Sequence, residues 1–350
     1  MTNTDYGNLP TVSILIPTYN SEKTLKGCLA SLSLQNYPKE KLEIIIADAG
    51  STDKTLQLIA DFSQDNSILK VIQIENPLKT GEAGKAEALK KASHQIVALI
   101  DSDNILPEKE WLLKMTRPFM DDQEIIGSEP LEYTYRKTDG YITRYCALIG
   151  MNDPLCLFLG NYDRISMVTG RWTDLKILAE DKGGYLKLDL PQGMLPTIGA
   201  NGTLFKRDLI FTNKDMKYLF DIDIICELVE QGKTKFAKVK TGIIHLFSGT
   251  VSTFIRKQNR RVRDFFHFKR EGERKYPWNK VNKAGLIKFV IYCLLVFPLF
   301  IQSFKGYRRQ KDKVWFFHPL ACLITLYVYA RGTIVGLVKK GTVSREKWSQ

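Results

Sequence analysis

The sequence lacks the cysteine spacing of a disulfide-stapled or zinc-binding protein. Its six cysteines are scattered over 350 residues without paired spacing, which indicates a reducing compartment. The first ten residues contain no apolar run, so no signal peptide is expected there and the folded part should stay in the cytoplasm. Acidic residues are few, 38 against 51 Lys and Arg, giving a formal net charge of +13. This excess favours an anionic partner: nucleic acid, an acidic membrane face or a phosphorylated compound.

The composition is that of a folded protein. With 44% hydrophobic and 25% charged residues, the chain is globular rather than disordered. Its length predicts two or three structural units.

Over the first 120 residues, short apolar runs alternate with segments of helical periodicity. This alternation predicts a parallel sheet with helices on both faces. Strands are expected at 12–16, 42–47, 69–74 and 96–100, and helices after Ser21, after Thr52 or Asp53, and from Gly81 to Ala92.

The middle of the chain is less regular. We expect an extended segment at 125–135, a glycine-rich loop entering a strand at 199–205, a helix from Met216 to Glu230 ended by Gly232, strands at 236–239 and 243–247, and a basic helix from Ser252 to Arg270.

Two long apolar stretches, 289–304 and 314–330, mark the last third of the chain. Each is near the lower length limit for a membrane span and has almost no polar face, which favours membrane association over a buried soluble hairpin. Basic residues flank both stretches and fill the loop between them, and Lys339 and Lys340 follow the second stretch. A two-pass hairpin would place the basic loop outside, against the positive-inside rule. Re-entrant or in-plane helices are therefore slightly favoured.

Four polar motifs follow expected strands or open an expected helix. Asp101-Ser102-Asp103 follows the strand 96–100, and two carboxylates there suit a divalent cation, although Asp and Asn also favour plain turns. Residues 17–20 (PTYN) and 48–53 (DAGSTD) offer an aromatic ring and carboxylates to a nucleoside. Residues 84–89 (GKAEAL) open a helix whose positive end and Lys85 suit a diphosphate. The carboxyl edge of an open α/β sheet is where ligands collect.

With these motifs the chain resembles the family-2 glycosyltransferases, inverting enzymes of the GT-A fold that use nucleotide-diphosphate sugars. The likeness rests on residues 12–20, 45–55, 84–89 and 101–103, and it is close over about the first 120 residues. Ala49 and Lys90 differ from the residues that are common at these positions in the family, so the nucleotide base of the donor stays open. The implied domains are residues 1–120 for the nucleotide sugar, 121–250 for the acceptor, 251–285 as basic juxtamembrane helices and 286–340 as two apolar membrane-associated helices.

The resemblance implies a set of site residues. Asp221 is expected to be the general base at the start of a helix, with Asp223 as the substitute candidate. Mg²⁺ or Mn²⁺ is expected on Asp101 and Asp103, with His245 as a weaker third ligand. The expected donor-binding residues are Pro17, Tyr19, Asn20, Asp48, Gly50, Asp53, Lys85, Asp101, Ser102, Asp103 and Asn201.

Residues 258–262 (QNRRV) resemble the Gln-x-x-Arg-Trp motif of membrane-bound, processive relatives such as cellulose and hyaluronan synthases. Val262 stands in place of the Trp, which weakens a polymerase interpretation. Gln258, Arg260 and Arg261 are instead expected to grip a diphosphate of the nucleotide or of a lipid-linked acceptor. The alternative is a basic helix lying on lipid headgroups.

The sequence thus predicts a metal-dependent inverting glycosyltransferase, with hexosyl transfer expected, that uses a UDP- or GDP-linked sugar. Its acceptor is expected to be polyprenyl-(di)phosphate-linked or a glycolipid, at the cytoplasmic face of the cell membrane, for surface glycan or glycoprotein assembly. The alternatives are a processive polysaccharide synthase and a catalytically silent nucleotide-sugar-binding scaffold. Basic residues cluster beside apolar segments, which favours an anionic membrane surface over nucleic acid. The oligomeric state, sugar and pathway stay open.

Overall fold

The computed structural model describes residues 6–211, 215–271, 274–277 and 280–338. Lys339 and Lys340 lie outside the described residues. The chain forms two compact units, each assembled from three stretches of sequence. Unit 1 comprises residues 1–131, 177–192 and 198–245, and unit 2 comprises residues 132–176, 193–197 and 246–350.

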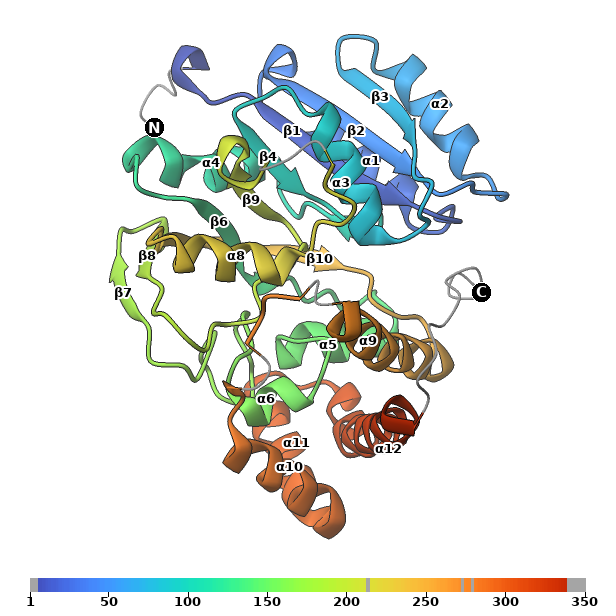
Figure 1. The fold of residues 1–350 in the computed structure, drawn as a ribbon, viewed down its shortest axis with the longest axis vertical. Helices are drawn as coiled ribbons and strands as arrows, with labels where there is room; N and C mark the ends of the chain where they lie inside the picture. The colour runs from blue at the N-terminus through green and yellow to red at the C-terminus, as the bar shows by residue number, and fades with distance from the viewer. Residues whose placement is uncertain (1–5, 212–214, 272–273, 278–279, 339–350) are drawn as a thin grey trace. The chain divides into compact units, whose positions relative to one another are not determined.

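A mixed sheet forms the centre of unit 1 (Figure 1). Its strands follow the order β3-β2-β1-β4-β9-β6-β10-β8-β7, with β5 paired to β10. The neighbours β3, β2, β1 and β4 run parallel, whereas β9, β8, β7 and β5 join by antiparallel pairing. The strands are β1 (Val12–Thr18), β2 (Leu42–Asp48), β3 (Lys70–Glu75), β4 (Ile96–Leu99), β5 (Asn104–Ile105), β6 (Gly127–Tyr133), β7 (Leu178–Asp181), β8 (Tyr185–Asp189), β9 (Thr203–Lys206) and β10 (Lys235–His245).

The apolar runs of the sequence explain which strands are central. Every residue of β2 is buried, as expected for a parallel strand covered on both faces, whereas the residues of the edge strand β3 are exposed or half-buried. The helices of unit 1 follow the strands as predicted, so the α/β fold is confirmed. They are α1 (Leu25–Ser33), α2 (Thr55–Asp65), α3 (Gly81–Lys91), α4 (Trp111–Asp121), α7 (Arg207–Ile210) and α8 (Asp221–Glu230), with the 3₁₀ turns η1 (Tyr6–Asn8) and η2 (Lys39–Lys41).

Two expected elements of unit 1 differ from the structure. The helix expected from Met216 begins at Asp221, because the N–H of Leu219 donates to the carbonyl of Glu82 and holds the preceding segment out of the helix. The two strands expected at 236–239 and 243–247 are the single strand β10, which pairs with β8 in its first half and with β5 at its end.

Unit 2 is helical around an aromatic core. Its elements are α5 (Tyr141–Ile149), α6 (Leu155–Leu159), α9 (Val251–Glu271), α10 (Lys283–Leu295), α11 (Phe297–Arg309), the 3₁₀ turn η4 (Lys313–Phe317) and α12 (His318–Val338). Tyr145, Phe254 and Phe317 pack edge to face at the centre, with Trp315 buried beside them. His318 is buried against the Tyr145 hydroxyl, and burial lowers its pKa to about 3, so this imidazole is neutral.

The apolar stretch 289–304 is not one helix. It is divided at Val296, which has φ of +59°, and α10 and α11 meet there at an angle of 99°. Pro298 lies in the first turn of α11, where its missing N–H is tolerated. By length and composition, one helix of the described residues, Lys313–Gly336, qualifies as a membrane span, and α10–α11 would be a second only as a bent span.

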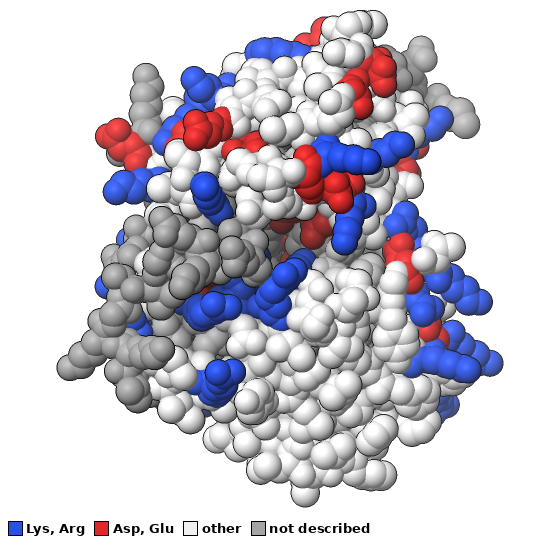
Figure 2. All heavy atoms as spheres, turned by 90° about the vertical axis from the view of Figure 1, so that its right-hand side faces the viewer, with Lys and Arg blue, Asp and Glu red and all other residues white. Residues whose placement is uncertain are grey.

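Helix α12 lies directly on α9 through two glycines. A Cβ atom at Gly332 would lie 2.2 Å from Val262 Cγ1, and one at Gly336 would lie 2.6 Å from the ring of Phe266. Val262, the residue at the predicted Trp position, is therefore part of the packing between two helices. The surface of the C-terminal helices, at the bottom of Figure 2, includes a wide area without charged side chains.

We expect Gly332→Ala to destabilise the protein by about 1–3 kcal/mol, because the added methyl group overlaps Val262 and the helices must separate. Gly249→Ala is the matched control, since a Cβ there meets no atom within 4 Å, and its effect should stay within about 0.5 kcal/mol. Urea unfolding measures both. Equal midpoints for the two variants would contradict the close packing of α9 and α12.

Candidate active site

The carboxyl ends of the parallel strands gather the predicted motifs at one edge of unit 1. Thr18 at the end of β1 pairs with Asp48 at the end of β2, and Leu99 at the end of β4 pairs with Leu15 on the other side of β1. The loops that follow these three strands therefore emerge along the same edge (Figure 1).

Asp48 shapes its own loop. Its buried carboxylate accepts hydrogen bonds from Thr18 Oγ1 (2.9 Å) and Ser51 Oγ (2.6 Å), and from the N–H groups of Gly50 (2.9 Å) and Ser51 (2.8 Å). Gly50 has φ of +82°, which favours glycine. The carboxylate predicted to contact a nucleoside is thus already occupied in holding the turn.

The loops after β1 and β2 are fastened together. The N–H of Asn20 donates to Ser51 Oγ (2.9 Å), and Asn20 Oδ1 accepts from the N–H of Thr52 (2.9 Å). Asp53 accepts from the N–H of Thr55, the first residue of α2 (3.0 Å), although the N-cap position itself is Lys54 and not the expected Thr52 or Asp53. Tyr19, the residue before Asn20, is half-buried.

Close packing brings the start of α3 to the sheet. A Cβ at Gly84 would lie 2.9 Å from both Pro17 Cβ and Asn76 Nδ2, so only glycine allows this approach. The next residue, Lys85, is buried, and its Nζ lies 3.2 Å from Asp101 Oδ1 and 3.8 Å from Asp221 Oδ2. Burial lowers the pKa of Lys85, but Asp101, Asp221 and Glu82 together raise it by more, so the amine stays protonated.

Asn104 organises the loop that carries Asp101 and Asp103. Its buried side chain accepts from the N–H of Asp101 (3.1 Å) and donates to Asp103 Oδ1 (3.3 Å) and Asn201 Oδ1 (3.0 Å). Ser102 Oγ lies 3.0 Å from Ser21 Oγ. Sequence reasoning missed Asn104 as a positioning residue, and its place directly after the two aspartates was the available signal.

His245 reaches the same loop through strand pairing. Asn104 and His245 are register partners in β5 and β10, and His245 Nε2 lies 3.4 Å from Asp103 Oδ2. Among the described residues, no group of three or more His, Cys, Asp and Glu side chains is arranged to hold a metal ion. Two partly exposed carboxylates nevertheless fit Mg²⁺ or Mn²⁺ of the kind that takes its remaining ligands from substrate phosphates and water.

Asp221 is the first residue of α8, which agrees with its expected place at the start of a helix. Its side chain is 29% exposed, whereas Asp223 is 3% exposed and directed into the protein. Burial raises the pKa of Asp221 and the positive charge of Lys85 lowers it, and the balance leaves this pKa above the usual value of an aspartate. Asp221 therefore suits a proton acceptor better than Asp223.

In unit 2, two of the three residues expected to bind a diphosphate are engaged within the unit. Gln258 Nε2 and Arg261 Nη1 donate to the carbonyl of Asn152 (3.1 and 2.9 Å), and Gln258 Oε1 accepts from the hydroxyl of Tyr329 (3.3 Å). Arg260 is 60% exposed, and its Nε lies 3.9 Å from Asp264 Oδ2 one turn further along α9. Their role in diphosphate binding stays a prediction.

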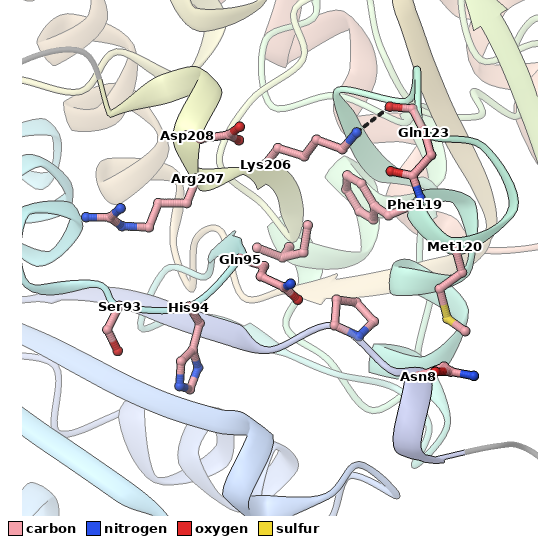
Figure 3. A pocket seen from close by; sticks show the side chains of 12 residues that line it. Asn8, Ser93, His94, Gln95, Phe119, Met120, Gln123, Lys206, Arg207 and Asp208 are labelled. Carbon is pink, nitrogen blue, oxygen red and sulfur yellow. Dashed lines mark hydrogen bonds between the residues drawn. The ribbon is translucent and has the colours of Figure 1, made fainter.

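A separate pocket of about 750 Å³ opens at the opposite edge of the sheet, where β1 and β4 begin (Figure 3). It is lined by His94, Gln95, Lys206 and Arg207 among others, and by none of the predicted site residues. The predicted site is therefore a set of loops, distinct from this pocket.

The comparisons with known proteins concern the family and the fold. Residues 13–174 match the model of the family described as Glycosyl transferase family 2. The chain carries a family-2 glycosyltransferase domain. The predicted family is thereby confirmed for this part of the chain.

Curated relatives match part of the chain. Glycosyltransferase AglE of Haloferax volcanii is 29% identical over 143 residues, which are 41% of this chain and 46% of that protein. The poly(ribitol-phosphate) β-N-acetylglucosaminyltransferase TarS of Staphylococcus aureus is 38% identical over 112 residues, 31% of this chain and 19% of that protein. The aligned stretches thus span less than half of either relative.

One solved structure resembles the chain over nearly its whole length. The mannosyltransferase PcManGT from Pyrobaculum calidifontis, solved with GDP-Man and Mn²⁺, matches 96% of this chain and 90% of its own, with a TM-score of 0.53 and 15% identity. At this identity the likeness concerns the fold alone, and it confirms the predicted GT-A fold.

Proposed function

We propose that the protein transfers a sugar, with inversion, from a nucleotide-diphosphate sugar to an acceptor hydroxyl. The observation that carries the proposal is the cluster of Lys85, Asp101 and Asp221, with Asp103 on the same loop as Asp101. It combines two carboxylates for a cation, a protonated amine and a separate carboxylate with a raised pKa at one sheet edge.

Asp101 and Asp103 are the residues proposed to hold Mg²⁺ or Mn²⁺. When bound, the cation would neutralise the charge that develops on the departing nucleoside diphosphate. Asn104 fixes both aspartates, and Lys85 adds a permanent positive charge beside Asp101. The Mn²⁺ and GDP-Man named with the PcManGT structure support this assignment. The donor's nucleotide base is proposed to be either uracil or guanine.

Asp221 is the proposed general base. It would accept the proton of the acceptor hydroxyl while the oxygen attacks the anomeric carbon from the face opposite the leaving group. Its raised pKa makes the carboxylate a stronger base, and the charge of Lys85 opposes its protonation at rest.

The proposed acceptor is lipid-linked or a glycolipid. Exposed apolar side chains of α10, α11 and α12 support this choice, because a soluble acceptor would not require them. A processive polysaccharide synthase is the alternative, but Val262 packs against Gly332 and leaves no aromatic ring for a growing glycan at that position.

A donor screen tests the proposal against a silent scaffold. In detergent, a UDP- or GDP-linked sugar should raise the melting temperature with Mn²⁺ present, and EDTA should abolish the shift. With that donor and a membrane lipid extract, nucleoside diphosphate should be released in a metal-dependent reaction. Stabilisation without any release would identify a scaffold, and no stabilisation by any donor would overturn the proposal.

A further inference from the structure

The corner between α10 and α11 is apolar and directed outward. Leu294, Leu295 and Phe297, the residues around the bend at Val296, are 73%, 64% and 70% exposed. Large apolar side chains gathered at such exposure mark an interaction site in a folded protein. On α12, Leu320, Tyr327 and Ile334 form an exposed stripe at helical spacing.

The charges around these residues have one sign. Residues 283–338 contain eight basic residues and a single acidic one, Asp312. Asp312 is buried, and its carboxylate lies 2.7 Å from Arg144 Nη1, so it adds no negative charge to the surface. Lys283, Lys288, Lys305 and Lys311 are exposed. The lowest part of Figure 2 shows the uncharged area that these helices present.

Helices α10 and α11 are too short to cross a bilayer one after the other. Each has 13 residues, which is about 20 Å of helix against a hydrocarbon core of about 30 Å. The 99° bend prevents their lengths from adding along one direction.

Helix α12 is long enough to span, but its packing opposes it. One face carries Ala321 and Cys322 in the core of unit 2, and its second half lies along α9 through Gly332 and Val262. Exposed basic residues occur along α9 from Arg256 to Arg270. A spanning α12 would therefore carry cationic side chains of α9 into the hydrocarbon core, which strongly disfavours insertion.

We infer that unit 2 docks on one leaflet of an anionic bilayer, with α10, α11 and the exposed stripe of α12 lying in the plane of the membrane and no segment of residues 283–336 crossing it. The apolar corner enters the boundary between headgroups and acyl chains, and the surrounding lysines and arginines contact anionic headgroups. The inference deepens the membrane part of the proposed function and does not depend on the transfer chemistry.

Vesicle flotation of the full chain tests the surface. The protein should float with phosphatidylcholine vesicles containing about 30% phosphatidylglycerol and bind pure phosphatidylcholine at least about tenfold more weakly. The double variant Leu295→Glu with Phe297→Glu should bind the anionic vesicles at least about 100-fold more weakly, since two inserted side chains become charged. Ile68→Glu and Leu178→Glu, at positions 79% and 78% exposed in unit 1, are matched controls that should bind like the parent.

Labelling separates in-plane docking from spanning. Lys311→Cys lies between α11 and η4, Thr333→Cys is exposed near the end of α12, and Lys91→Cys lies at the end of α3 in unit 1. In sealed membrane vesicles, a membrane-impermeant maleimide should label all three cysteines from the same side. Labelling from opposite sides would overturn the inference in favour of a spanning segment, and the unsubstituted chain gives the background from its native cysteines.

Two other results would also overturn it. If the corner variant changes a dimer into a monomer while vesicle binding stays intact, the surface holds a second copy of the chain. If the variant floats like the parent, lipid does not contact the corner. Donor-dependent stabilisation should persist in the corner variant, so loss of vesicle binding and loss of donor binding report separately on this inference and on the proposed function.

Discussion

Asp221→Asn should lower sugar transfer by about 1,000-fold and leave donor binding unchanged. The amide keeps the shape of the side chain and can still accept from the N–H of Ile222, but it cannot take a proton from the acceptor. Transfer is measured at saturating donor by release of nucleoside diphosphate in the presence of lipid extract, and donor binding by calorimetry.

The pH dependence of the parent protein follows from the same group. Asp221 must be ionised to act as a base, and its pKa lies above the usual value because burial outweighs the charge of Lys85. The rate at saturating donor should therefore fall as the pH drops through this raised pKa. The acid limb of the pH–rate profile should lie above about pH 4, which is the ordinary pKa of an aspartate.

Two variants control this prediction. Asp65→Asn removes an exposed carboxylate at the end of α2 and should transfer at the parent rate. Asp223→Asn should retain most of the activity, because Asp223 is buried. Near-normal transfer by Asp221→Asn together with a large loss in Asp223→Asn would move the base to Asp223.

Asp103→Ala should lower transfer by about 100- to 1,000-fold and remove the metal-dependent part of donor binding. The substitution deletes one of two carboxylates proposed to hold the cation against the diphosphate. Asp103 is a cleaner test than Asp101, because Asp101 is also the nearer partner of buried Lys85, and its loss leaves that charge poorly compensated.

The measurement compares the thermal shift given by donor and Mn²⁺ with the shift given by donor alone. In Asp103→Ala the two shifts should be equal, whereas in the parent the metal should add to the shift. A metal-dependent shift that survives in both Asp103→Ala and Asp101→Ala would exclude this loop as the cation site.

The parts of the candidate site that lie directly after apolar strands could be predicted from the sequence. Apolar runs located β1, β2 and β4, and the rule that parallel strands end at one edge predicted that the loops with Asp48 and Asp101 emerge at the same edge. The glycine at position 84 could be assigned to a helix start, but its contact with Pro17 became visible only in the packed structure.

Other features depend on contacts between distant residues. The bend at Val296 requires a left-handed backbone that a valine rarely adopts, so the apolar pattern favoured one continuous segment instead. The first residue of α8 depends on a hydrogen bond from Leu219 to Glu82. His245 reaches Asp103 only because β5 pairs with β10, and the two units are assembled from interleaved stretches that no local pattern marks.

Mn²⁺ binding followed by electron paramagnetic resonance tests the central claim most directly. With the nucleoside diphosphate of the donor present, the parent chain should take up Mn²⁺ from solution in a stoichiometric amount. Asp103→Ala should bind it at least about 100-fold more weakly, and Asp65→Ala should bind it like the parent. If Asp103→Ala binds Mn²⁺ with the nucleotide as tightly as the parent, the loop after β4 does not hold the cation and the proposed site is wrong.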